Sequence, residues 1–113
     1  MVGLILSAVV LSGCFRSTPK GFDAAAPEGR LDAIVRAARE KDRSAVPDLV
    51  VQLESDDPAV RTLAITALEH ITGETLGYRQ EAPEAERRVA VDRWQQWTVA
   101  QGLVPASKEA ARP

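Results

Sequence analysis

The chain offers few side chains of the kind that carry out chemistry. It holds one cysteine, Cys14, and one histidine, His70. A cysteine nucleophile needs a base beside it, and a zinc site needs several His, Cys or carboxylate ligands, so neither can be assembled from these two residues. No glycine-rich run precedes a Lys-Ser or Lys-Thr pair, which excludes a phosphate-binding loop of that kind. We therefore expect no catalysis and no metal or other cofactor.

A short acidic cluster at Glu54, Asp56 and Asp57 is the nearest approach to a cation site. It lacks the twelve-residue spacing and central glycine of a calcium loop. The same residues suit the end of one helix and the N-cap of the next, where a carboxylate accepts hydrogen bonds from free backbone N–H groups. His70 falls near the end of a predicted helix, where a cation or donor is favourable. Both features are interpreted as structural.

Aromatic side chains give the candidate binding residues. Trp94 and Trp97 lie three residues apart, so they share one face of a helix. Tryptophan is enriched in binding hot spots, but each ring also buries about 150 to 250 Å² in a core. We favour a place in the core over an exposed binding surface for the two rings, and a packed Trp94 with Trp97 at the rim is a further alternative. Trp97 and Tyr78 are the candidate partner-binding residues.

Composition and charge narrow the class of protein. The 113 residues are 45% hydrophobic and 27% charged, with a formal net charge of −2. This hydrophobic and charged content is typical of one globular domain, and the chain has no excess of positive charge of the kind that binds nucleic acid. Five arginines are spread among acidic residues and are expected to form a solvated face: Arg30, Arg36, Arg39, Arg43 and Arg61.

The elements that must position these side chains are helices, and the clearest are two antiparallel ones between residues 44 and 73. The first has an apolar stripe with period 3.6 at Val46, Leu49, Val50 and Leu53. The second repeats the pattern at Val60, Leu63, Ala64, Ala67, Leu68 and Ile71. Asp57 and Pro58 suit its start, and Gly73 suits its end, since glycine readily takes the left-handed conformation.

Two further helices flank this pair. Residues 29–41 present Leu31, Ile34, Val35 and Ala38 on one face. A last helix opens at Pro83, carries Ala90, Val91, Trp94 and Trp97 inward, and ends around Gly102. The loop between Gly73 and Pro83 is long, so we expect Leu76 and Tyr78 to pin it to the helices.

The motif AVPDLVVQLESDDPAVRTLAITALEHITG resembles a short HEAT repeat. The matching positions are Pro47, Leu49, Leu53, Asp57, Pro58, Val60, Arg61, Ala64, Ala67, Leu68 and Gly73. The resemblance covers about a quarter of the chain well and implies an all-α fold, an α-solenoid of about four helices in antiparallel hairpins. It also implies a module that binds other proteins and has no catalysis of its own. The Gly-Tyr loop and paired tryptophans resemble the C-terminal pattern of short bacterial HEAT-repeat proteins.

The N-terminal stretch MVGLILSAVVLSGC predicts the cellular location of the protein. This apolar run is too short to span a bilayer but fits the core of an export signal. Its last four residues, Leu11 to Cys14, resemble the bacterial lipobox, which implies cleavage between Gly13 and Cys14 and a diacylated Cys14. No Lys or Arg precedes the run, unlike most secretory signals, and a buried N-terminal helix with a free thiol is the alternative.

The predicted organisation is a signal peptide at 1–13, a flexible tether at 14–28, a HEAT-like domain at 29–103 and a disordered tail at 104–113. The expected protein is a lipoprotein of the bacterial cell envelope, held on a membrane by Cys14, whose domain binds or scaffolds a partner protein. Phe15 in place of aspartate after the cysteine favours the outer membrane. The alternatives are a purely structural envelope lipoprotein, or an accessory subunit of an envelope enzyme or lyase.

Overall fold

The structure is a computed structural model that describes residues 21–103. The predicted signal peptide, Gly13 and Cys14, most of the predicted tether and the predicted tail lie outside the described residues. Within 21–103 the chain is all-helical and contains no strand, with four α-helices and one 3₁₀ turn: α1 Pro27–Glu40, η1 Arg43–Ala45, α2 Val46–Gln52, α3 Pro58–Thr72 and α4 Glu84–Ala100. The expected all-α fold with about four helices is confirmed.

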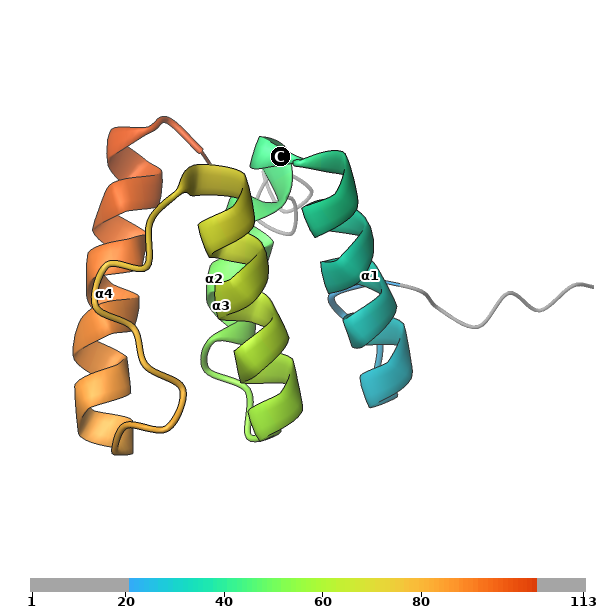
Figure 1. The fold of residues 1–113 in the computed structure, drawn as a ribbon, viewed down its shortest axis with the longest axis horizontal. Coiled ribbons are helices and arrows are strands. Elements are labelled where there is room, and N and C mark those ends of the chain that lie inside the picture. The colour runs from blue at the N-terminus through green and yellow to red at the C-terminus, as the bar shows by residue number, and fades with distance from the viewer. Residues whose placement is uncertain (1–20, 104–113) are drawn as a thin grey trace, which may run out of the picture.

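The α2–α3 hairpin forms the middle of the molecule (Figure 1). α1 packs against α3 on one side, and α4 packs against α2 on the other. α1, α3 and α4 run in the same direction and α2 runs in the opposite one, as the colours in Figure 1 show. The chain must therefore return along the length of the helices between α3 and α4, and residues 73–83 make that return.

The ends of α3 follow from their sequence. The Asp57 side chain accepts a hydrogen bond from the Ala59 backbone N–H at 2.9 Å, and Pro58 is the first helical residue. Gly73 ends the helix with φ of 78°, a left-handed conformation that costs glycine little. These caps are those predicted from the sequence. They fix the length of the central hairpin.

The first helix of the hairpin is divided. Arg43–Ala45 form a 3₁₀ turn, and the α-helix proper begins at Val46. The Asp42 side chain accepts a hydrogen bond from the Ser44 N–H at 3.0 Å and so starts the turn. The predicted apolar stripe of this helix is confirmed, since all four of its residues are buried: Val46, Leu49, Val50 and Leu53.

The helical body begins earlier than the sequence analysis placed it. α1 starts at Pro27, and residues 21–26, which were assigned to the flexible tether, lie against the body. Gln52 Nε2 donates a hydrogen bond to the Phe22 carbonyl at 3.2 Å, and Arg30 Nη1 donates to the Ala24 carbonyl at 3.1 Å. Such side-chain hydrogen bonds to main-chain carbonyls have no recognisable pattern in the sequence.

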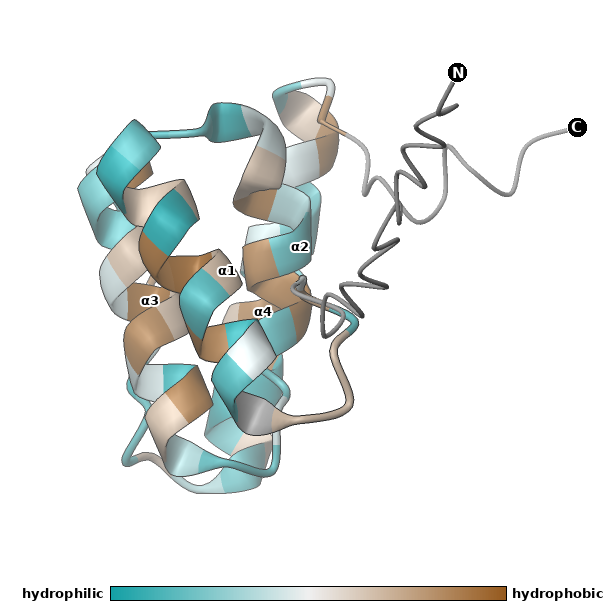
Figure 2. Ribbon diagram, turned by 90° about the vertical axis from the view of Figure 1, so that its right-hand side faces the viewer, coloured by the Kyte–Doolittle hydropathy of each residue, from teal (hydrophilic) through white to brown (hydrophobic). Residues whose placement is uncertain are grey.

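One core joins all four helices. Its fully buried members include Ile34, Leu49, Leu68, Val91 and Trp94. Figure 2 shows hydrophobic segments along the sides where the helices face one another. On α1 the inward face is turned slightly from the predicted one, because Ala37 is buried while Val35 is only half-buried. No helix within 21–103 is long and apolar enough to cross a bilayer.

Candidate functional site

The two tryptophans of α4 have different surroundings. Trp94 has no exposed surface, and its Nε1–H donates to the Thr75 carbonyl at 2.9 Å. Trp97 is half-buried and packs edge-to-face on Trp94, with ring centroids 5.5 Å apart. Trp94 thus lies in the core and Trp97 at its rim, which is one of the alternatives that the sequence left open. Trp97 therefore keeps part of its ring available at the surface.

A cation lies over that ring. The guanidinium carbon of Arg43 is 5.7 Å from the centroid of Trp97, within the range of a cation–π contact. Arg43 Nη2 also donates to Gln101 Oε1 at 3.3 Å. Trp97, Arg43 and Gln101, called here the Trp97 surface, bring η1 to the end of α4. They form a partly exposed aromatic patch with a fixed positive charge.

Tyr78, the second candidate binding residue, lies in the core instead. Only 4% of it is exposed, and its hydroxyl donates to the Leu53 carbonyl at 2.8 Å. Burial raises the pKa of the phenol above its ordinary value, although the positive charges of Arg61 and Arg87 act in the opposite direction. The side chain pins the 73–83 loop to the hairpin, as expected, and this placement leaves no binding surface on Tyr78.

The loop is held at a second point. Leu76 and Gly77 both take positive φ, of 53° and 78°. A Cβ on Gly77 would lie 2.8 Å from Arg93 Nη1, whose guanidinium donates to the Leu76 carbonyl at 3.3 Å. Glycine at position 77 thus serves both the turn and this close approach.

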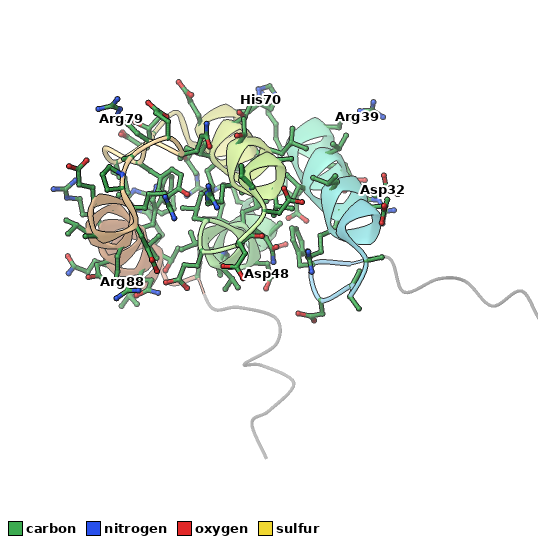
Figure 3. The ribbon with its side chains drawn as sticks, turned by 90° about the horizontal axis from the view of Figure 1, so that it is seen from below. Asp32, Arg39, Asp48, His70, Arg79 and Arg88 are labelled. Carbon is green, nitrogen blue, oxygen red and sulfur yellow. The ribbon has the colours of Figure 1, made fainter. Side chains whose placement is uncertain are left out.

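The remaining residues considered for chemistry stay apart. His70 is exposed near the end of α3 (Figure 3), and Asp57 caps that helix. Within residues 21–103 no group of three His, Cys, Asp or Glu side chains could hold a metal ion. Cys14 and Gly13 lie outside the described residues.

Sequence reasoning missed Arg61. It was grouped with the solvated arginines, which is wrong, because only 9% of its surface is exposed. Its Nη1 donates to the Ser55 carbonyl at 2.9 Å, while its buried Nε has no hydrogen-bond partner among residues 21–103. Arg61 is in register with Ala64 and Leu68 at i, i+3 and i+7, so the helical period carried a signal of its burial.

Arg61 lines a pocket of about 340 Å³ at the end of the molecule where α2 ends and α4 begins. We call it the Arg61 pocket. Leu53 and Val91 supply apolar walls, and its charged lining comes from Glu54, Asp56, Glu84, Arg61, Arg87 and Arg88. Figure 3 views the molecule from this end.

No protein-family model, curated protein or solved structure matches this chain.

Proposed function

We propose that this protein is a non-catalytic, HEAT-like binding module, tethered to an envelope membrane by a diacylated Cys14. Two regions carry the proposal. The lipobox-like residues Leu11 to Cys14 supply the anchor, and the helical body supplies a surface for a partner protein.

The packing of α1 on α3 supports a short α-solenoid. In a solenoid of helical hairpins, the second helix of each unit stacks on the second helix of the next. α3 is the second helix of the central hairpin, and α1 runs parallel to it at its side (Figure 1). α1 then corresponds to the second helix of a preceding unit whose first helix is replaced by residues 21–26.

The Trp97 surface is the single observation that favours a binding module over a purely structural lipoprotein. Aromatic rings and arginine are the side chains most enriched where binding energy is concentrated. Here an arginine is already ordered over a half-exposed tryptophan, so little side-chain entropy would be lost when a partner covers both.

Site-specific photo-cross-linking tests this assignment. A photoreactive phenylalanine analogue placed at Trp97 in intact cells should give one discrete cross-linked product. The matched control places it at Arg79, which is exposed on the 73–83 loop (Figure 3). Absence of a product at position 97, or the same product from both positions, would argue for the purely structural alternative.

The anchor is tested separately. Cys14→Ser should abolish labelling with palmitate and move the protein out of the membrane fraction, because no thiol remains to accept the lipid. Unchanged membrane association of this variant would contradict the lipid anchor while leaving the binding surface untouched.

A further inference from the structure

Within residues 21–103, the buried guanidinium of Arg61 forms no ion pair with a carboxylate. Ion pairs within residues 21–103 join Arg79 to Glu81 and Arg88 to Glu84, and neither includes Arg61. Its hydrogen bond goes to a neutral carbonyl, of Ser55. A buried charge is costly unless it is paired. Among the described residues, the carboxylates of Glu54 and Asp56 line the same pocket but form no ion pair with Arg61, so its charge is only partly offset.

A second guanidinium shares the pocket. Arg87 is half-buried at the start of α4, and its Nη1 donates to the Ala82 carbonyl at 2.7 Å. Each arginine is thus held in place by one main-chain acceptor, and these two hydrogen bonds use only the Nη1 group of each side chain. Two oriented guanidinium groups suit a carboxylate, which accepts paired hydrogen bonds from such donors.

The rim of the pocket limits the kind of anion. Glu54 and Asp56 are exposed at the end of α2, and the Arg88–Glu84 pair adds no net charge. These carboxylates repel a phosphate dianion or a nucleic acid. They can instead accept hydrogen bonds from the backbone N–H groups of a bound peptide.

We propose that the Arg61 pocket binds a carboxylate of a peptide segment. Arg61 and Arg87 would donate hydrogen bonds to this carboxylate, and the acidic residues at the rim would repel polyanions. The inference rests on the proposed function in one respect, since the carboxylate would belong to the partner protein. It uses a different end of the molecule from the Trp97 surface.

Nuclear magnetic resonance of the arginine Nε–H groups tests the proposal on the full chain. The probes are an acetylated alanine tripeptide with a free C-terminus, its C-terminal amide, and an amidated tripeptide with a central aspartate. The Arg61 Nε–H signal should shift saturably with a carboxylate-bearing probe. The first and third probes distinguish a chain terminus from an acidic side chain as the source, and saturation by either supports the proposal.

Variants define the receptor. Arg87→Gln should weaken the binding about tenfold or more, because it removes a charge-assisted hydrogen bond to the carboxylate. Arg88→Gln, at the exposed rim, should change it less than about twofold. Because Arg61→Lys also loses the bond to Ser55 and can unfold the chain, Arg87→Gln is the decisive variant.

Three results would overturn the proposal. The neutral amide could shift the Arg61 signal as strongly as the free acid, or inorganic phosphate could bind more tightly than both carboxylate probes. Alternatively, Glu54→Gln could move the Arg61 signal without any ligand, which would show that the missing anion is internal. Loss of peptide binding with retained cross-linking at position 97 would overturn the pocket and leave the proposed function standing.

Discussion

The two ends of the helix stack are closed by different means. At the α4 end, two large aromatic side chains reach main-chain carbonyls, with Trp94 bonded to Thr75 and Tyr78 to Leu53. At the α1 end, the apolar contacts come from aliphatic side chains of α1, with Ile34 the most buried, and from Phe22. Residues 21–26 are held through their own carbonyls by Gln52 and Arg30. Both ends cover the hairpin with a non-helical segment.

This comparison indicates which residues contribute most to the free energy of unfolding at each end. A buried aromatic ring contributes much more apolar area than an alanine, so a few residues dominate the α4 end. The α1 end relies instead on smaller aliphatic side chains, of which Ile34 is the most buried. We therefore expect α4 to be the firmer cap of the two.

Replacing Trp94 by alanine should have the largest effect. The change removes a fully buried ring and its hydrogen bond to Thr75, and should lower the free energy of unfolding by about 3 to 5 kcal/mol. That is a large share of the roughly 5 to 15 kcal/mol of a typical domain. Urea denaturation measures it, with half-buried Trp97→Ala as the milder control. An equal loss for both variants would contradict the core-and-rim assignment.

Ile34→Ala probes the α1 end in the same way. Ile34 is 1% exposed, and truncating such a residue costs about 2 to 5 kcal/mol, the lower values applying where neighbours can relax into the space. Because the Ile34 side chain is smaller than that of Trp94 and forms no hydrogen bond, we expect a loss smaller than that of Trp94→Ala. A larger loss in the urea experiment would reverse the ranking of the two ends.

The hydrogen bonds that hold the two non-helical segments can be compared directly. Tyr78→Phe leaves the Leu53 carbonyl without its donor in the core and should cost about 1 kcal/mol. Gln52→Met removes the bond to the Phe22 carbonyl, which is only part-buried and can bind water, so its cost should be smaller. Thermal unfolding of the two variants measures the difference, and equal shifts would mean that the segments are held equally firmly.

The smallest effect concerns Asp48, which faces residues 21–26 from α2. Burial, with the nearby charges of Asp23 and Asp42, raises the pKa of Asp48 above its ordinary value of 3.8. The folded state therefore binds this proton more readily than the unfolded one, and ionised Asp48 lowers stability at neutral pH. Asp48→Asn should raise the urea midpoint at pH 7, with the gain shrinking as the pH falls toward 3.8.

A second variant links this effect to the α1 end. If residues 21–26 remain docked in solution, Asp23→Asn should reproduce part of the gain at pH 7, because one of the charges that oppose Asp48 is then absent. No change in the midpoint of Asp23→Asn would mean that this segment leaves the body.

The parts of the fold that could be predicted from sequence are those set by local rules. The helical period of the apolar residues predicted most of the buried helix faces. Asp57, Pro58 and Gly73 predicted the two ends of α3, because each residue type has a preferred place at a helix end. The docking of residues 21–26 could not be predicted, since it depends on Gln52, far away in the sequence. Arg61 was predicted to be exposed because it is charged, although its position in α3 falls within the apolar stripe.

The shared direction of α1, α3 and α4 has an electrical consequence. Each α-helix carries about half a positive charge at its N-terminus and half a negative charge at its C-terminus. Three N-termini and one C-terminus therefore meet at the end of the molecule where the α2–α3 turn lies (Figure 1). Glu28 in α1, Asp57 before α3 and Glu84 in α4 stand at those three starts. Their carboxylates offset the positive ends of the three aligned helix dipoles, so the three helices can share one direction without leaving an uncompensated positive end.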